Sequence, residues 1–140
     1  MQSGPASLLK ISDAANLAIH AMAHIAGSDS NETHSVATIA AKQGVSEAHL
    51  SKVMQRLARA GLLASRRGPG GGFVLSRPAE KIALLEIYEA IDGPVGDSRC
   101  LLGREHCLLS RCALGDLLHR VHKEVRQFLS SRRLSDLMPG

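Results

Sequence analysis

Three cysteines stand close together in the second half of the chain: Cys100, Cys107 and Cys112. Six and four residues separate them, and the surrounding segment lacks helical periodicity, so we expect an irregular loop that lets the thiols converge. Thiolates are soft ligands that suit zinc and iron–sulfur clusters, both of which generally need four ligands. Zinc modules usually carry two paired cysteine motifs, and this segment lacks a second pair. The residues alone leave four interpretations open: free surface thiols, a zinc site, a thiol–disulfide switch or an iron–sulfur cluster.

A second group of residues with chemical potential is basic. Between residues 48 and 79 the chain has six cationic side chains and no acidic one, although its net charge is only +4. The six are Lys52, Arg56, Arg59, Arg66, Arg67 and Arg77. Cations that face phosphates supply affinity for DNA, whereas an ordinary run of charge is a solvated face. The clustering favours a polyanionic partner if these residues lie on one surface.

The elements that carry these cations have the layout of a winged helix-turn-helix unit. Apolar residues at helical spacing, with serines in capping positions, predict helices at residues 12–26, 36–43, 46–60 and 82–91. Gly44 marks a tight turn between the second and third of them, as in a helix-turn-helix. Two strand-like runs at 62–66 and 72–76 flank a glycine-rich tip and predict a hairpin, the wing.

The C-terminal part predicts one long amphipathic helix. From Cys112 onward, Leu, Val and Phe recur at three- and four-residue steps, which indicates a helix of about 20 residues. Such a stripe favours a dimer seam, with packing onto its own domain as the alternative. The expected fold is mainly α with a small β-hairpin wing, a winged helix-turn-helix domain plus a long C-terminal dimerisation helix. The expected segments are a flexible N-terminus (1–9), a DNA-binding domain (10–92), a cysteine-containing sensor loop (93–111), and a dimerisation helix and tail (112–137).

These elements define the residues that we expect to contact double-stranded DNA. On the polar side of the third helix they are Ser46, Glu47, His49, Ser51, Lys52, Gln55 and Arg56, and in the wing they are Arg66, Arg67, Gly70 and Gly71. RNA and single-stranded DNA are not expected, because only three residues are aromatic and modules for those ligands stack bases on aromatic rings.

Other classes of protein fit the sequence poorly. The glycine-rich stretch 68–72 has no Gly-Lys-Ser/Thr after it, and Cys107 beside His106 lacks an orienting third group, so no enzyme is predicted. His20 and His24 have a chelating spacing but no third ligand nearby. The odd cysteine count, the start of the chain and the absence of a long apolar run predict a cytoplasmic protein without a membrane span.

Four segments together resemble the Rrf-two family of bacterial transcription regulators, which includes an iron–sulfur-cluster regulator and a nitric-oxide-sensitive repressor. They are residues 10–20, 39–62, 68–73 and the three-cysteine loop before the long helix. The resemblance implies a homodimer whose cysteines bind an iron–sulfur cluster (2Fe-2S or 4Fe-4S) in each subunit. In one branch the fourth ligand is a histidine three residues after the last cysteine, where this chain has Gly115. In another it is an aspartate of the partner subunit near the start of the first helix, and Asp13 stands there.

Asp13 is equally placed to act as a helix cap, and His106, His119 and His122 are competing ligands. The expected function is that of a homodimeric DNA-binding transcription regulator that senses redox state, iron or nitric oxide through the cluster. The alternative keeps the DNA binding and drops the cluster, with cysteine oxidation, a small ligand or a protein partner as the signal. A third possibility is a protein–protein adaptor that uses the long helix.

Overall fold

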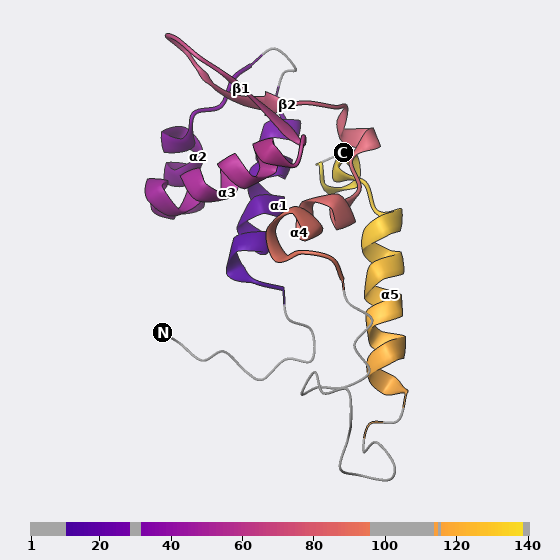
Figure 1. Ribbon diagram of the computed structural model, residues 1–140. Helices are drawn as coiled ribbons and strands as arrows, with labels where there is room; N and C mark the ends of the chain where they lie inside the picture. The colour runs from indigo at the N-terminus through magenta and orange to yellow at the C-terminus, as the bar shows by residue number, and fades with distance from the viewer. Residues whose placement is uncertain (1–10, 29–31, 96–113, 115, 139–140) are drawn as a thin grey trace.

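The computed structural model describes residues 11–28, 32–95, 114 and 116–138, which form helices around one two-stranded hairpin (Figure 1). The α-helices are α1 (Asp13–Ala26), α2 (Val36–Gln43), α3 (Glu47–Arg59), α4 (Leu84–Asp92) and α5 (Leu117–Ser131). The strands are β1 (Leu63–Arg66) and β2 (Gly72–Leu75), and the short 3₁₀ helices are η1 (Ala79–Lys81) and η2 (Leu134–Leu137). The predicted fold is confirmed: a mainly helical chain with a small wing and a C-terminal helix.

Serine caps fix where the first three helices begin. The hydroxyl oxygens of Ser12, Ser35 and Ser46 each accept a bond from the backbone N–H three residues later, at 3.0 to 3.1 Å. Each bond satisfies a donor that the first turn of a helix leaves unpaired. At the other end of α2, Gly44 adopts a left-handed conformation with φ +68°, which residues with a Cβ rarely take. The chain can therefore turn sharply from α2 into α3.

The core lies where α1, α3 and α4 meet, and the wing and η2 close its ends (Figure 1). Its largest fully buried side chains are Met22, Ile39, Leu50, Met54, Leu57, Leu62, Ile82, Ile87 and Leu134. Burying one such side chain stabilises the fold by roughly 1.5–3 kcal/mol. Because α3 contributes Leu50, Met54 and Leu57, the packing that holds the domain together also fixes this helix in place.

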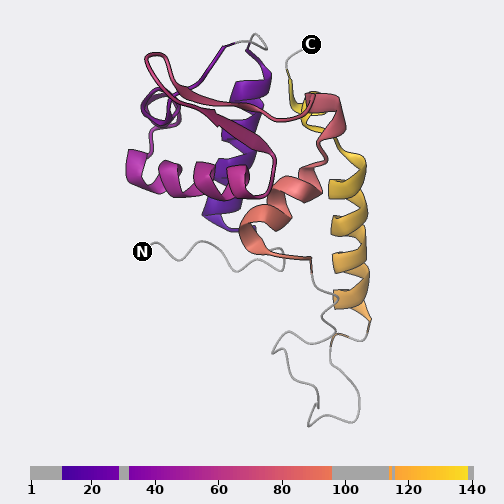
Figure 2. The same cartoon turned by 45° about the horizontal axis from the view of Figure 1, so that its top comes forward.

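The hairpin pairs its strands in antiparallel register. Leu63 lies opposite Leu75, and Arg66 lies opposite Gly72, so the tip comprises residues 67–71. In both ribbon views this tip projects past α2 (Figure 2). The wing thus stands next to the helix-turn-helix.

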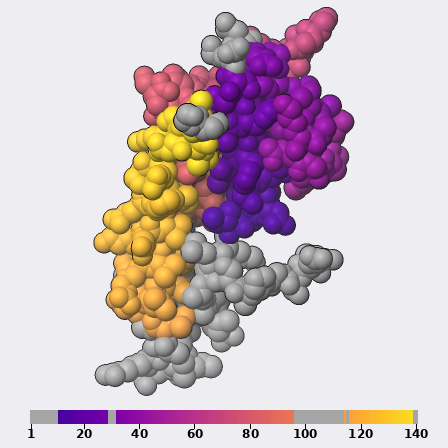
Figure 3. Space-filling view, turned by 180° about the vertical axis from the view of Figure 1, so that it is seen from behind, coloured from indigo at the N-terminus to yellow at the C-terminus, as the bar shows by residue number. Residues whose placement is uncertain are grey.

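Helix α5 is shorter than predicted. It has 15 residues and begins at Leu117, whereas Leu114 and Asp116 are in turns. Gly115, a poor helix former, stands between those two residues and weakens any helix running through from Cys112. Cys112 itself lies outside the described residues. In the view from behind, α5 forms the outer flank of the molecule (Figure 3).

After α5 the chain returns to the winged-helix core. The N–H of Leu84 donates to the carbonyl of Arg132 (3.0 Å), and the N–H of Leu134 donates to the carbonyl of Ile82 (2.8 Å). The Leu134 side chain is completely buried. The sequence pattern did not predict this return, which ties the C-terminal end of α5 to the domain, while α5 itself packs on α4. None of the described helices has the length and apolarity needed to cross a bilayer.

Candidate nucleic-acid interface

Helix α3 has one buried and one exposed side. Leu50, Val53, Met54 and Leu57 face the core. The residues of α3 and its cap predicted to contact DNA are Ser46, Glu47, His49, Ser51, Lys52, Gln55 and Arg56, and all are exposed except the half-buried Ser51. These polar side chains therefore occupy the exposed surface of α3, as a recognition helix requires.

Arg56 has a second partner inside the molecule. Its Nη2 donates a hydrogen bond to the carbonyl oxygen of Ile91 at 2.5 Å. Ile91 is in the last turn of α4, where helix carbonyls have no intrahelical partner. The guanidinium thus satisfies one of these carbonyls and links the recognition helix to the end of α4.

The two wing arginines lie at the exposed end of the hairpin. Arg66 is the last residue of β1, and Arg67 begins the tip. Gly70 has φ +74°, and a Cβ on Gly71 would lie 2.5 Å from the carbonyl oxygen of Arg66. These glycines are therefore required by the turn itself, and the turn presents Arg66 and Arg67 to solvent.

Arg77 differs from the other cations of the basic stretch. Its Nη2 lies 2.7 Å from Oε1 of Glu86, and its Nη1 donates to the carbonyl of Lys81. Partial burial alone would raise the pKa of the Glu86 carboxyl, but the bonds from Arg77 and from the N–H of Ala83 lower it overall. Glu86 of α4 thus forms an ion pair with one cation of the stretch that has no acidic residue of its own, and Arg77 has a structural role.

The start of α1 is joined to the end of α4. The N–H of Ser12 donates to Oδ2 of Asp92 at 3.1 Å, and its hydroxyl donates to Oδ1. Asp13, the candidate fourth ligand, follows Ser12 and is exposed. Val95, three residues after Asp92, is the last described residue before the cysteines. Asp13 therefore lies close to the point where the chain enters the cysteine segment.

Cys100, Cys107 and Cys112 lie outside the described residues, as does His106. Within the part of the chain that the structure describes, no three His, Cys, Asp or Glu side chains form a group suited to a metal ion. His20 and His24 do not converge on a shared site there: Nδ1 of His20 donates to the carbonyl of Asn16 (2.8 Å), and the ring of His24 contacts that of His34.

Sequence reasoning missed the contacts under the wing. The backbone of His34 exchanges two hydrogen bonds with that of Phe73 (3.0 and 2.8 Å), and the hydroxyl of Thr33 donates to the carbonyl of Gly70. A Cβ on Gly72 would lie 2.4 Å from the carbonyl oxygen of His34. The segment before α2 thus holds the wing in place. The glycine run was the only sequence signal of this close approach.

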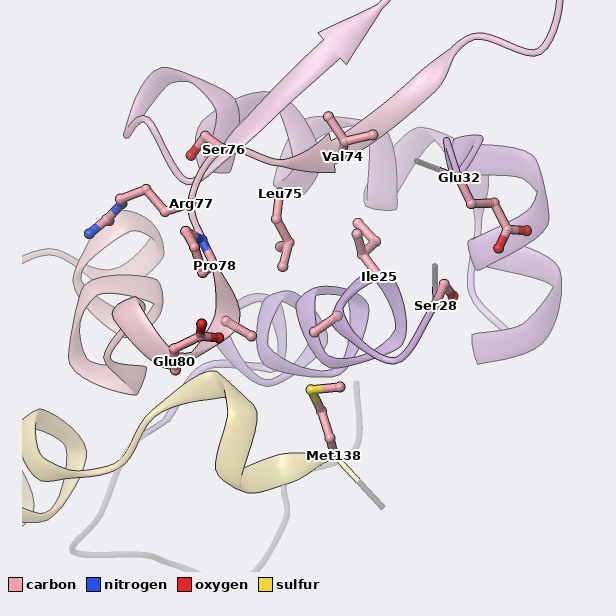
Figure 4. Close-up of a pocket in the computed structure, with 12 residues that line it drawn as sticks. Ile25, Ser28, Glu32, Val74, Leu75, Ser76, Arg77, Pro78, Glu80 and Met138 are labelled. Atoms are coloured by element: carbon pink, nitrogen blue, oxygen red, sulfur yellow. The ribbon is translucent and has the colours of Figure 1, made fainter. Parts of the chain in front are cut away.

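A hollow of about 450 Å³ lies on the other side of β2, between the end of α1, η1 and the C-terminal Met138 (Figure 4). In the close-up, Ile25 and Leu75 approach its centre, and Arg77 points away from it. None of the residues predicted to contact DNA lines this hollow.

Comparison with known proteins identifies the family. The model of the Rrf2 family, described as iron-dependent transcriptional regulator, matches residues 11–140. The chain belongs to the Rrf2 family. The transcriptional regulator IscR of Photorhabdus laumondii is 33% identical over 131 residues, 93% of this chain and 79% of that protein. IscR of Xenorhabdus nematophila is 32% identical over the same shares of the two chains.

Solved structures of Rrf2 regulators share the fold. CymR, the global cysteine regulator of B. subtilis, superposes with a TM-score of 0.79 at 29% identity, covering 92% of this chain and 95% of that one. IscR of T. potens gives a TM-score of 0.73 at 26% identity, covering 92% and 85%. The Rrf2 chain is thus a transcriptional regulator of the winged-helix type, a type that binds DNA, and its relatives are named as regulators rather than enzymes.

Proposed function

We propose that this Rrf2 protein is a homodimeric DNA-binding regulator whose affinity for its operator depends on an iron–sulfur cluster held by Cys100, Cys107 and Cys112. The cluster is of 2Fe-2S or 4Fe-4S type, and the signal is redox state, iron or nitric oxide. The proposal is supported by the iron-dependent description of the matching family and by the three thiols in one short segment. A cluster held by thiolates supplies a redox-active group. In the proposal, its gain or loss shifts the population between dimers that bind DNA and dimers that do not.

The structural observation that carries the proposal is the pair of links at the last turn of α4. Arg56 of the recognition helix donates to the carbonyl of Ile91, and Ser12, the cap of α1, donates to Asp92. The predicted cysteine-containing loop, residues 93–111, begins directly after Asp92. A rearrangement of the cysteine segment therefore acts on a turn that is bonded to both α1 and α3.

A hydrogen bond of this kind carries enough free energy to contribute to regulation. A hydrogen bond to a charged group contributes about 1.5–3 kcal/mol when it is buried, and less when it is partly exposed, as here. Allosteric coupling typically needs about 1–3 kcal/mol, or roughly 5- to 150-fold in affinity. In the proposal, breaking or forming the bond between Arg56 and Ile91 changes DNA affinity by a factor near the lower end of this range.

The donor set on the chain fits a cluster with one weaker ligand. Three thiolates suit iron, and the carboxylate of Asp13 is a harder donor that makes a site more labile. Asp13 is exposed, and its neighbour Ser12 is bonded to Asp92 at the entry to the cysteine segment. As an exposed side chain, Asp13 is available as a ligand to the cluster of a partner subunit.

The DNA-contacting residues of the proposal are those assembled on α3 and at the wing tip. The face of α3 that begins at Ser46 enters the major groove, and Arg66 and Arg67 contact phosphates or the minor groove. Gly70 and Gly71 give the tip its shape. Two such heads in a dimer read half-sites about one helical turn apart, so the operator is roughly palindromic.

The dimer interface of the proposal is the outer side of α5. Leu118 and Leu129 are buried, and Leu129 packs in the core of the chain's own domain. Leu117 and Phe128, eleven positions apart on another side of the helix, remain 36% and 53% exposed. Exposed large apolar side chains at three-turn spacing are suited to a partner helix.

Anaerobic purification of the full chain tests the proposal. We expect brown protein with visible absorption, stoichiometric iron and sulfide, and DNA affinity that changes when the cluster is removed. Cys107→Ala should lose the absorption, while Ser130→Ala, at an exposed position of α5, should keep it. Colourless protein that cannot be reconstituted with iron and sulfide would contradict the cluster.

A second candidate function keeps the same DNA interface and uses the cysteines without a cluster. It is favoured by the structural similarity to CymR of B. subtilis, named a global cysteine regulator, and to an oxidised form of CymR from Staphylococcus aureus (TM-score 0.78, 26% identity, 94% of this chain and 98% of that one). In that case, colourless protein would change its DNA affinity on thiol oxidation and recover it on reduction.

A further inference from the structure

A cavity of about 250 Å³ lies at the root of the wing, where the end of α1, the segment before α2 and the wing turn meet. No predicted function uses it, although Gly70 and Gly71 form part of its wall. Its ionisable lining consists of His24, Glu32, His34 and Lys42, one residue or more from each of these helices and the segment between them. A hollow on which several polar groups converge is a candidate site for a polar ligand.

His34 is the residue that the fold leaves unsatisfied. Its side chain is only 5% exposed, and its Nε2 is buried without a hydrogen-bond partner among the described residues. A buried polar atom without a partner costs free energy, and in proteins such atoms are usually paired with a protein group, a water molecule or a ligand. Because His34 lines the cavity, a ligand there is placed to supply the missing partner.

The charges around His34 favour an anion. The ring of His24 meets that of His34 edge to face, with centroids 5.2 Å apart. Burial lowers the pKa of His24 first, and the positive charge of Lys42 and the neighbouring His34 lower it further, while Glu32 opposes them. An anion bound beside His24 would oppose the effects of burial and of Lys42, and would favour the protonated ring. A metal ion fits less well, because the described residues contain no three-ligand group and Lys42 repels cations.

We propose that this cavity is an oxyanion site that takes a sulfate- or phosphate-type group between Lys42, His24 and His34. The lysine and the protonated His24 ring supply charge, and Nε2 of His34 donates a hydrogen bond to an anion oxygen. The oxyanion is either a free ion or a phosphate of bound DNA, since the two present the same chemistry.

The cavity wall is tied to the wing, so its occupant bears on wing position. Thr33 is bonded to Gly70, and the backbone of His34 is paired with that of Phe73. An anion held by His34 therefore steadies the segment from which the wing is supported.

Sulfate remains a dianion around and above the pKa of His24, so titration of the full chain with sulfate at different pH values tests the site without DNA. Sulfate replaces chloride at constant ionic strength, and the ring signals of His24 and His34 are followed by NMR. We expect saturable shifts, and affinity that falls by up to about tenfold per pH unit above the pKa of His24, because binding takes up a proton. Lys42→Gln should weaken binding about tenfold or more, and the exposed control Lys81→Gln should leave it unchanged.

The two sources of the oxyanion are separated by DNA titrations of the same variants. If DNA supplies the phosphate, Lys42→Gln weakens DNA binding in chloride and sulfate competes with DNA. If the ion is free, Lys42→Gln binds DNA normally in chloride but loses the response to sulfate. Absence of saturable shifts in the wild type, or equal sulfate affinity in Lys42→Gln and Lys81→Gln, overturns the proposal. The DNA-free titration is independent of the proposed regulatory function.

Discussion

The guanidinium of Arg56 donates a hydrogen bond to the carbonyl oxygen of Ile91, which joins the recognition helix to the last turn of α4. Sequence alone assigns Arg56 to the DNA-contacting cations. The structure adds a role within the protein, because the same side chain satisfies a helix-terminal carbonyl. Arg67, in contrast, stands exposed at the wing tip. The two arginines are therefore expected to respond differently to substitution.

Arg56→Ala should weaken binding to all duplex sequences and also lower the free energy of unfolding by about 1 kcal/mol, since it removes a partly exposed bond to a charged donor. Arg67→Ala should weaken DNA binding with no measurable loss of stability, and should reduce the slope of log affinity against log salt by about one. Urea denaturation and duplex titration at two salt concentrations measure both. Wild-type affinity and salt slope in both variants would show that the proposed DNA face is wrong.

Substitution at the link between α1 and α4 should uncouple DNA affinity from the state of the cysteines. Asp92→Asn weakens the bonds from Ser12 and leaves the DNA-facing side of α3 untouched. We expect the ratio of DNA affinities between the two cysteine states to fall toward one. Typical allosteric coupling makes such a ratio about 5- to 150-fold, which is the most that the substitution can remove. Asp136→Asn, in η2, is the matched control. An unchanged ratio in Asp92→Asn would argue against transmission through this link.

Gly72→Ala should destabilise the protein and displace the wing. The added Cβ would lie 2.4 Å from the carbonyl oxygen of His34 and 2.9 Å from the nitrogen of Ser35, both of them backbone atoms. Relieving such overlap typically costs about 1–3 kcal/mol, and DNA affinity should fall with it. At Gly44, with φ +68° and open space, alanine should cost about 1–2 kcal/mol without affecting the wing. Thermal melts and duplex titrations distinguish them, and equal DNA affinity in both variants would contradict a fixed wing.

Acidification should destabilise the region around His24. The pKa of His24 lies below its ordinary value of 6.5, chiefly through burial and then through Lys42. The stability gained by keeping the ring neutral is present above 6.5 and is lost as the pH falls through the lowered value. Between about pH 7.5 and about pH 5.5, the melting temperature of His24→Gln should therefore decline less than that of the wild type. Identical declines would show that His24 contributes nothing to this dependence.

Phe128→Gln should weaken self-association and leave the monomer folded. Phe128 is 53% exposed. Among the aromatic and cation–π interactions of the described residues, its ring takes part in one, with the guanidinium of Arg132. Loss of a large buried side chain from a dimer seam should raise the dissociation constant about tenfold or more. Sedimentation velocity over a range of concentrations measures it, with the exposed Gln127→Ala as control. A dimer of unchanged strength would place the interface elsewhere.

The helices and wing could be predicted from the sequence because local rules specify them. Ser35 and Ser46 cap the helices that they were expected to cap, and Gly44 ends α2 as expected. Of the two caps that the sequence offered for α1, Ser12 and not Asp13 is the one that forms. The predicted start of α5 was wrong because apolar spacing continues through Leu114, whereas Leu114 and Asp116 are in turns and the helix begins at Leu117. Periodicity detects a face, but it does not locate the first helical residue.

The sequence by itself determined the elements, the basic face of α3 and the cysteine spacing, since these depend on residues near one another in the chain. Only the tertiary structure decided the partners of those residues: Ile91 for Arg56, Asp92 for Ser12, and Phe73 for His34. These pairs are 35, 80 and 39 positions apart, so no local pattern records them. The first two form because burying the apolar faces of α1, α3 and α4 in one core brings their polar ends together. The third forms where β2 lies alongside the segment before α2.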